Sequence, residues 1–133
     1  MLKKILLAFA ILLACGGIVV YWQWNKPHLK AEKIKAVEVT ADGIVKEFGT
    51  DEQAANKKYL NKVIEVSGTI GEVDKNQDGG LMLVLQTSDP MAGIQCAMRD
   101  KSCNATKGQQ ITIKGFCSGS GIAGVSLTDC IIN

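Results

Sequence analysis

Apolar and polar positions alternate through five short segments in the second half of the chain. Turn-forming residues separate these segments, which are 63–70, 81–85, 94–98, 110–115 and 125–128. Most of them place an apolar side chain at every second position, the period of a half-buried strand. The segment 81–85 is apolar throughout, so either both of its faces are covered or one is left exposed. Past residue 127 the alternation shifts near Asp129, which indicates a β-bulge. Five short strands in this order predict a small closed β-barrel.

A helical entry precedes the predicted strands. Thr40 can cap a helix whose apolar residues Ile44 and Phe48 fall on one face. Thr50, followed three residues later by Gln53, forms a capping-box pattern for a second helix. We expect these two helices to close one end of the barrel.

The amino-terminal part of the chain predicts a membrane anchor. Residues 5–22 carry no charge, Lys3 and Lys4 precede them, and aromatic residues gather at their end. Roughly 20 apolar residues span the hydrocarbon layer of a bilayer, and amphipathic aromatic side chains favour its headgroup region. We therefore expect three parts along the chain: a signal-anchor transmembrane helix over 1–24, a polar tether over 25–35, and the helical entry with the barrel over 36–133.

Two other fates of the amino-terminal segment stay open. The stretch Leu-Leu-Ala-Cys at 12–15 resembles a lipobox, which would make Cys15 a lipidation site, and a cleaved signal peptide is the second alternative. The apolar run continues beyond Cys15, where a mature lipoprotein normally turns polar, so a retained anchor is favoured. The basic start of the chain predicts an inside amino terminus and a domain in the periplasm or outside the cell. By the positive-inside rule, the lysines within 26–35 favour the opposite orientation.

The charge of the domain is balanced. Once Lys3 and Lys4 are set aside, the 15 basic residues of the chain fall to 13 and equal the 13 acidic ones. A nucleic-acid binder needs a surplus of cations to displace counterions from phosphates. The overall charge therefore argues against a nucleic-acid partner.

The cysteines beyond the anchor offer several pairings. Cys96, Cys103, Cys117 and Cys130 allow three disulfide connectivities, and the sequence does not choose between them. One or two disulfides would suit an oxidising envelope compartment. Buried free thiols are the alternative, because the strand alternation turns Cys96 and Cys117 inward. The spacing contains no Cys-x-x-Cys pair, so neither a thioredoxin-type site nor a zinc knuckle fits.

The segment 74–80 partly matches a calcium-binding loop. Asp74, Asn76 and Asp78 fall at the first, third and fifth positions of an EF-hand loop, but Leu85 stands where a bidentate Glu is needed. A polar hairpin turn is the favoured interpretation, and weak calcium binding by the three residues stays open.

The sequence contains no recognisable catalytic set. Its single histidine, His28, lies in the predicted tether, so Ser-His and Cys-His catalysis inside the barrel are excluded. We therefore expect no enzymatic activity and no cofactor.

Several stretches of the chain, in order and spacing, resemble a known family of short bacterial envelope proteins. They are 21–28, 40–48, 51–60, 62–68, 114–119 and 125–130. The resemblance is to the tRNA-anticodon-like OB-fold proteins, which are often described as lipoproteins and are largely uncharacterised. It implies a five-stranded OB-fold barrel behind a membrane-directed amino terminus. It implies no particular ligand, since a fold does not fix a function.

Aromatic residues are scarce where OB-folds usually stack nucleic-acid bases. Between residues 25 and 133 the aromatic residues are Phe48, Tyr59 and Phe116, and 81–98 contains none. Base stacking contributes about 1–3 kcal/mol per base in single-strand binders. This scarcity weakens the nucleic-acid hypothesis further.

Together these features predict a membrane-tethered, non-enzymatic OB-fold module for binding or interaction in the bacterial cell envelope. We expect its partner to be another envelope protein, or a small or saccharide ligand, rather than nucleic acid. The stretch 118–124 is expected to be a flexible loop between the last two strands and to border the binding face. The predicted ligand rim consists of Lys75, Asn76, Leu83, Ser118, Gly119 and Ser120. The alternative is a single-stranded nucleic-acid-binding OB-fold that faces the cytoplasm.

Overall fold

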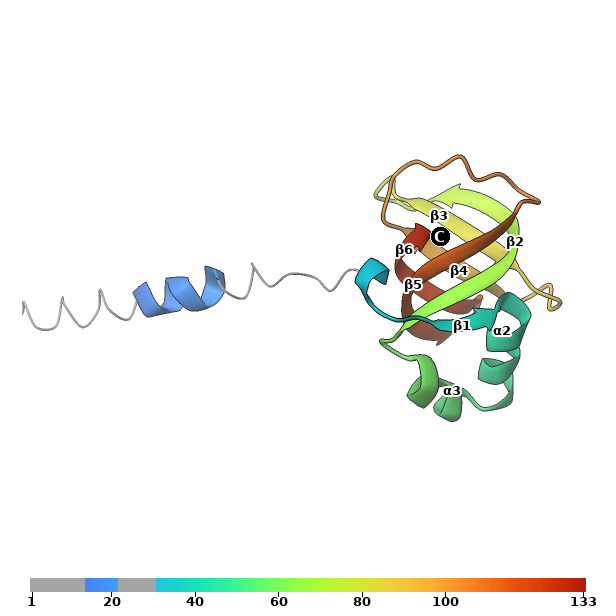
Figure 1. Cartoon of the computed structure of the whole chain (residues 1–133), viewed down its shortest axis with the longest axis horizontal. Helices are drawn as coiled ribbons and strands as arrows, with labels where there is room; N and C mark the ends of the chain where they lie inside the picture. The colour runs from blue at the N-terminus through green and yellow to red at the C-terminus, as the bar shows by residue number, and fades with distance from the viewer. Residues whose placement is uncertain (1–13, 22–30) are drawn as a thin grey trace, which may run out of the picture.

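The computed structural model describes residues 14–21 and 31–133 (Figure 1). Residues 14–21 are helical. Among the described residues no helix combines the length and apolar character that crossing a bilayer requires. Most of the predicted anchor and tether lies outside the described residues, and the transmembrane part of the predicted architecture therefore stays a prediction.

The folded part consists of six strands and three short helical elements. The helical elements are η1 (Ala31–Lys33), α2 (Ala41–Thr50) and α3 (Glu52–Tyr59). The strands are β1 (Val37–Thr40), β2 (Val63–Lys75), β3 (Leu81–Gln86), β4 (Gly93–Met98), β5 (Gln110–Gly121) and β6 (Gly124–Ile132). The strand order is β1-β2-β3-β4-β6-β5, and an additional β2–β5 pairing closes the sheet. The predicted closed barrel of five strands is thus confirmed in β2–β6.

Strand β2 pairs along both of its edges, and this closes the barrel. Its first half, from Val63 to Thr69, pairs antiparallel with β5, and its second half, from Thr69 to Lys75, pairs antiparallel with β3. The register shifts between Ile70 and Glu72, just after the point where the pairing partner of β2 changes from β5 to β3. Such irregularities increase the bend and twist of a strand, as a small barrel requires.

The core follows the predicted alternation of apolar residues. In β3, Leu81, Leu83 and Leu85 point inward, whereas Met82 and Val84 are half-buried on the outer face. The uniformly apolar run 81–85 is therefore a strand with one covered and one partly open face. The other strands contribute the remaining large and fully buried side chains of the barrel, namely Ile64, Val66, Ile70, Ile94, Ile113, Val125 and Leu127.

The first helix begins where the sequence predicts, and the second begins one residue later. The Thr40 side chain accepts a hydrogen bond from the Gly43 amide (3.1 Å), as an N-cap does. The predicted Thr50 cap is wrong, because Thr50 still lies in the last turn of α2 and donates to the Lys46 carbonyl (2.8 Å). Asp51 caps α3 instead and accepts a hydrogen bond from the Ala54 amide (3.0 Å).

Two strand segments differ from the prediction. Strand β1 pairs parallel with β2 outside the barrel, and the sequence did not reveal it, because Val39 alone among its four residues is turned partly inward. The segment 118–121 belongs to β5 rather than to a loop. Gly119 and Ser120 pair with Ser126 and Val125 of β6, so tertiary pairing overrides the weak strand propensity of Gly and Ser.

The bulge predicted near Asp129 is present. Asp129 has a φ of 52°, in the left-handed region, and the register of β6 against β4 shifts beside it. The Arg99 guanidinium holds the Asp129 carboxylate with two hydrogen bonds, from Nε to Oδ1 (2.7 Å) and from Nη2 to Oδ2 (2.6 Å). The Arg99 amide also donates to the Cys130 carbonyl (2.9 Å). The end of β4 therefore fixes the bulge in β6.

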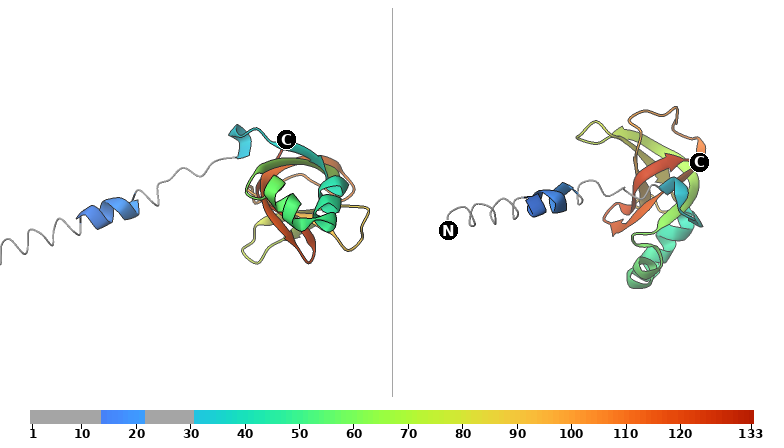
Figure 2. Two further views of the ribbon diagram at one scale, coloured as in Figure 1. Left: turned by 90° about the horizontal axis from the view of Figure 1, so that it is seen from below. Right: turned by 60° about the vertical axis from the view of Figure 1, so that its left-hand side comes forward.

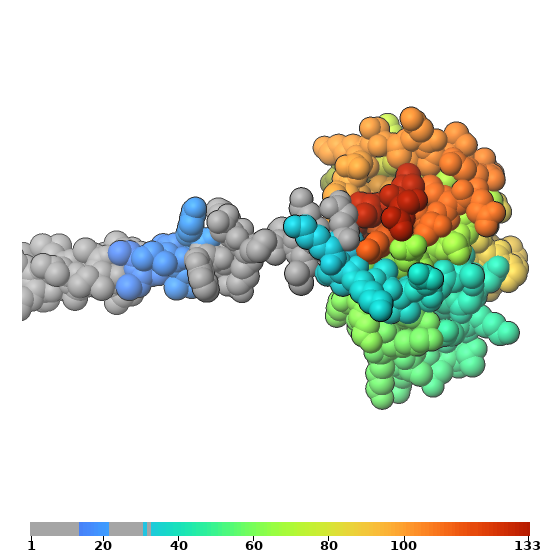
Figure 3. Space-filling view, viewed as in Figure 1, coloured from blue at the N-terminus to red at the C-terminus, as the bar shows by residue number. Residues whose placement is uncertain are grey.

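The two ends of the barrel are covered by different elements. Figure 2 shows α2 and α3 over one end, where Ile44 and Phe48 are buried in the core. The segment 99–109 covers the other end, and Cys103 and Ala105 pack there against the core. In the space-filling view these two covers lie at opposite ends of the visible face (Figure 3). The expectation that the helical entry closes one end is confirmed.

The close approach of α2 to β2 provides a test of this closure. A Cβ atom at Gly68 would lie 3.0 Å from the Ala41 Cβ and 3.5 Å from the Leu85 Cβ. We expect Gly68→Ala to lower the free energy of unfolding by about 1–3 kcal/mol, because α2 must move outward. Urea denaturation measures this change. Gly121→Ala is the matched control, since a Cβ there meets nothing within 4 Å, and equal losses in the two variants would contradict the packing.

Candidate functional site

The outer face of β3 and β4 is partly apolar and partly open. Met82 pairs with Ala97, and Val84 pairs with Gln95, so these four side chains share one surface. All four are half-buried. In OB-folds, the face of the second and third barrel strands and the flanking loops form the ligand-binding surface. Strands β3 and β4 are the second and third strands of this barrel.

A groove of about 530 Å³ lies over this face. Its floor comes from β2, β3 and β4, and its walls come from the β3–β4 loop (residues 87–92) and the β5–β6 turn. Its lining residues include Glu72, Val84, Gln86, Asp89, Met91 and Gln95. Ala123 lies at the β5–β6 turn end of the groove. The groove therefore occupies the position at which OB-folds hold their ligands.

The chemistry of this groove is polar but not cationic. Gln86 and Gln95 supply amides that can both donate and accept hydrogen bonds. Glu72 and Asp89 add two carboxylates. Met91 contributes an apolar side chain that is 82% exposed. The groove can thus bind a flat, hydrogen-bonding ligand, but its own charge is negative.

The β3–β4 loop that forms one wall of the groove is held by several local hydrogen bonds. The Thr87 hydroxyl lies within hydrogen-bonding distance of the carbonyls of Asp89 and Ala92, which share its single proton. The Asp89 carboxylate accepts from the Met91 amide (2.9 Å), and the Asp89 carbonyl accepts from the Ala92 amide (3.2 Å). These contacts give the wall a defined shape, so the groove does not depend on a ligand to form.

The same loop is tied to helix α2. The Ser88 amide donates to the Asp42 carboxylate (2.5 Å), and this hydrogen bond lowers the pKa of Asp42. A second hollow of about 610 Å³ lies between α2 and the loop, lined in part by Thr87 and Asp89. Thr87 and Asp89 therefore line a hollow on each side of the loop.

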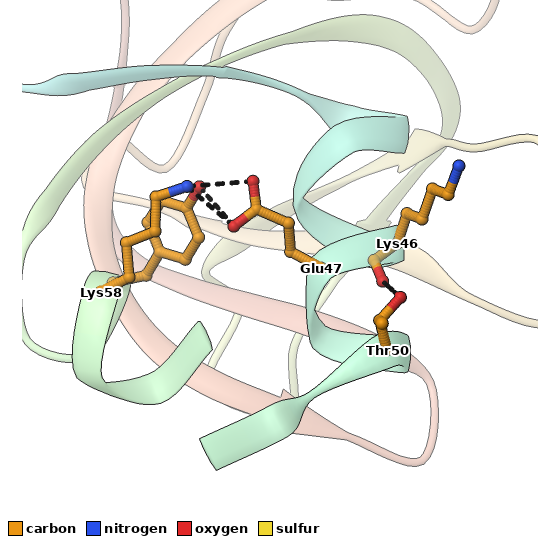
Figure 4. A network of polar contacts seen from close by, with 5 residues as sticks. Lys46, Glu47, Thr50 and Lys58 are labelled. Carbon is orange, nitrogen blue, oxygen red and sulfur yellow. Dashed lines mark hydrogen bonds and ion pairs between the residues drawn. The ribbon is translucent and has the colours of Figure 1, made fainter. Parts of the chain in front are cut away.

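Helices α2 and α3 are joined by a network around Glu47 (Figure 4). The Lys58 ammonium donates to both Glu47 carboxylate oxygens (3.0 and 2.8 Å), and the Tyr59 hydroxyl donates to one of them (3.0 Å). Hydrogen bonding to Lys58 lowers the pKa of Glu47, and the same contact raises the pKa of Lys58. Burial raises the pKa of Tyr59. This network fixes α2 and α3 relative to each other.

The predicted rim residues are spread over the molecule. Lys75 and Asn76 lie at the β2–β3 hairpin, whereas Ser118, Gly119 and Ser120 lie within β5. Leu83 is fully buried in the core, so Met82 and Val84 form the accessible side of β3 in its place. The sequence contained one signal for the observed groove: Gln86 and Gln95 stand at outward positions of strands whose inward positions are apolar.

The partial calcium loop forms a compact turn. The Asn76 side-chain oxygen accepts from the amides of Asp78 (3.1 Å) and Gly80 (2.7 Å), and Asp74 accepts from the Lys75 amide (2.7 Å). Gly79 takes a φ of 76°, which suits glycine. Across residues 14–21 and 31–133, no cluster of three or more His, Cys, Asp or Glu is arranged to hold a metal ion. Weak calcium binding stays a prediction.

The chain is similar to known proteins at the level of family and fold. The family model described as tRNA_anti-like matches residues 1–131. The chain belongs to the tRNA_anti-like family. The resemblance stated from the sequence is thereby confirmed. No curated protein matches the chain significantly.

Two solved structures resemble this tRNA_anti-like domain. One is a "putative nucleic acid-binding lipoprotein" from Klebsiella pneumoniae subsp. pneumoniae MGH 78578, with 15% identity and a TM-score of 0.55 over 72% of this chain and 92% of that chain. The other is a "putative aspartyl-tRNA synthetase" from Leishmania major Friedlin, with 10% identity and a TM-score of 0.46 over 87% of this chain and 25% of that chain. The Klebsiella likeness shows a shared fold.

These comparisons correct the predicted partner of the tRNA_anti-like domain. The balanced charge and the scarce aromatic residues of the sequence argued against a nucleic-acid partner. The matching family and the Klebsiella protein both point to nucleic-acid binding, so that prediction is wrong. Family and neighbour are proteins of a binding type, in agreement with the prediction of a binding module.

The Glu47 network predicts a pH dependence of stability. The pKa of Glu47 is lower in the folded chain than its ordinary value of 4.5. Its link with Lys58 therefore stabilises the fold above that ordinary value and is lost as the pH falls through the folded pKa. We expect Glu47→Gln to lower the melting temperature at pH 7, and we expect this difference from the wild type to shrink as the pH falls below 4.5.

Thermal melts from pH 7 to pH 3 measure this difference. Glu52→Gln, at the start of α3, is the matched control, and its difference from the wild type should change less with pH. A Glu47→Gln difference that stays constant across the range would contradict the network.

Proposed function

We propose that this chain is an envelope-associated OB-fold module that binds single-stranded nucleic acid in the groove over β3 and β4. The observation that carries the proposal is the place of this groove, on the barrel face that OB-folds use for oligonucleotides. The tRNA_anti-like family match and the name of the Klebsiella relative support the choice of ligand.

The groove suits recognition of bases better than recognition of phosphates. Unpaired bases expose donors and acceptors along their edges, and side-chain amides can pair with them in a bidentate manner. Gln95 pairs with Val84, two residues before Gln86 on the same face of β3, and both glutamines line the groove. Val84 and the exposed Met91 provide apolar contact for the faces of the bases.

The carboxylates set the path and the strength of binding. Glu72 and Asp89 would repel a phosphate that entered the groove, so the sugar-phosphate chain would run along the outside and the bases would point in. Few counterions would then be released, and binding would weaken only slowly with added salt. The absence of aromatic residues from 81–98 removes the stacking contribution. The proposed binding is therefore of moderate affinity.

The amino-terminal segment would keep this module at a membrane. The uncharged run at 5–22, or lipidation at Cys15, would supply the attachment, and the description of the Klebsiella relative as a lipoprotein supports an envelope location. The domain would then meet nucleic acid at the membrane surface.

The amides give the first test of the groove. We expect Gln95→Ala to weaken binding of a single-stranded mixed-sequence DNA by about threefold to tenfold, because a hydrogen bond to a base contributes roughly 0.5–1.5 kcal/mol. Fluorescence anisotropy with a labelled oligonucleotide measures the dissociation constant. Gln53→Ala on α3, outside the groove, is the matched control. Unchanged binding by Gln95→Ala would overturn the site.

The carboxylates give a test in the opposite direction. We expect Glu72→Lys to tighten binding and to steepen the salt dependence by about 0.7 in the slope of log K against log salt, because one added phosphate contact releases counterions. Glu52→Lys, outside the groove, should change both quantities less. A Glu72→Lys variant that binds no better than the wild type would show that the nucleic acid lies elsewhere or does not bind.

A further inference from the structure

Two buried cysteines lie on neighbouring strands of the barrel. Cys96 is on β4, Cys130 is on β6, and both are 0% exposed. Strands β4 and β6 pair in parallel, with Cys96 opposite Leu127 and Met98 opposite Cys130. Cys130 therefore lies diagonally across this pairing from Cys96, level with the residue two positions farther along β4.

The bulge at Asp129 places Cys130 inside the barrel. Val125 and Leu127 are buried at alternate positions of β6, and continued alternation would turn residue 129 inward and residue 130 outward. Asp129, in the left-handed conformation, inserts one extra residue, so Cys130 is the next side chain to face the core. Without this bulge Cys130 would point away from Cys96.

The neighbouring strand leaves room for the Cys130 side chain. Gly115 of β5 lies against it, and a Cβ atom at Gly115 would be only 2.6 Å from the Cys130 sulfur. Hydrogen bonding to the Cys130 thiol, followed by burial, raises the pKa of the Cys96 thiol well above its ordinary value. Both side chains thus face the same closed part of the core.

The pairing of Cys96 with Cys117 fits less well. Leu127 stands between Cys96 and Cys117, because it pairs with Cys96 on one side and with Cys117 on the other. The Cα atoms of Cys96 and Cys117 are therefore two strand spacings of about 4.8 Å apart. This distance exceeds the roughly 7 Å that a disulfide can span. Cys103 lies in the covering segment 99–109 and is half-buried.

We propose that Cys96 and Cys130 form a disulfide that joins β4 to β6. The described cysteines are free thiols, so the bond would form by oxidation. The two thiols lose two protons and two electrons, and a donor disulfide is reduced to two thiols in exchange through a mixed disulfide. Because burial disfavours the reactive thiolate, the exchange would take place before the barrel is fully closed.

The position of this bond gives it a structural role. Within the barrel, the β4–β6 pairing is parallel, whereas the other four pairings are antiparallel. Parallel pairing is slightly less stable per residue and joins strands that are distant in sequence. The disulfide would stabilise the β4–β6 pairing and thereby hold β4, which carries Gln95, in place.

Peptide mapping of the full chain tests the proposal. The chain is refolded in detergent micelles with oxidised and reduced glutathione, its remaining thiols are alkylated, and it is digested with trypsin without reduction. Cleavage after Lys75, Arg99 and Lys114 separates Cys96, in peptide 76–99, from Cys130, in peptide 115–133. We expect these two peptides to be linked, and reduction should separate them.

Two variants identify the sulfur atoms, because Cys117 shares a peptide with Cys130. The link should persist in Cys117→Ala and in Cys103→Ala. A link that disappears in Cys117→Ala, a link from Cys96 to the peptide of Cys103, or alkylated Cys96 and Cys130 in the refolded wild type would overturn the proposal. In the oxidised wild type, we expect reduction to lower the melting temperature by about 10 °C.

Discussion

The fold depends on one strand that pairs along both of its edges. Strand β2 pairs with β5 through its first half and with β3 through its second half, and the irregularity between Ile70 and Glu72 lets it bend from one to the other. This closure removes the open edges from the five barrel strands and leaves β1 as an added strand outside. The two faces of the sheet thereby become the inside and the outside of a barrel. The buried core and the open groove both depend on that separation.

The closed barrel determines where a ligand can bind. Its interior is filled by aliphatic side chains and cysteines, and its two ends are covered by α2 with α3 and by the segment 99–109. The outer face of β3 and β4 remains partly open, and the loop that Asp42 holds through Ser88 forms its wall. The groove thus belongs to the barrel itself, in agreement with a binding role for the family.

Much of the barrel could be predicted from local patterns, because each strand repeats its apolar residues at the period of its own backbone. The Thr40 cap and the bulge at Asp129 were visible for the same reason. Strand β1 could not be recognised in the same way, since four residues with one partly inward side chain carry almost no period. The continuation of β5 through Gly119 depends on its pairing with β6, which no local pattern shows.

The candidate site was harder to predict, because it joins residues that are distant in sequence. Glu72, Gln86 and Gln95 meet in one groove only after three strands have paired in the observed register. The same holds for Cys96 and Cys130, whose proximity depends on a single extra residue in β6. Composition also misled the choice of partner, because total charge and aromatic content do not show that the amides of Gln86 and Gln95 line one groove.

An NMR titration of the isotope-labelled full chain in detergent micelles with single-stranded DNA tests binding in the groove most directly. We expect saturable shifts of the backbone amides of β3, β4 and the β3–β4 loop, together with the side-chain amides of Gln86 and Gln95. The same sequence in a duplex should cause smaller shifts, because its base edges are paired. Saturable shifts confined to other surfaces, or no shifts at all, would contradict binding in the groove.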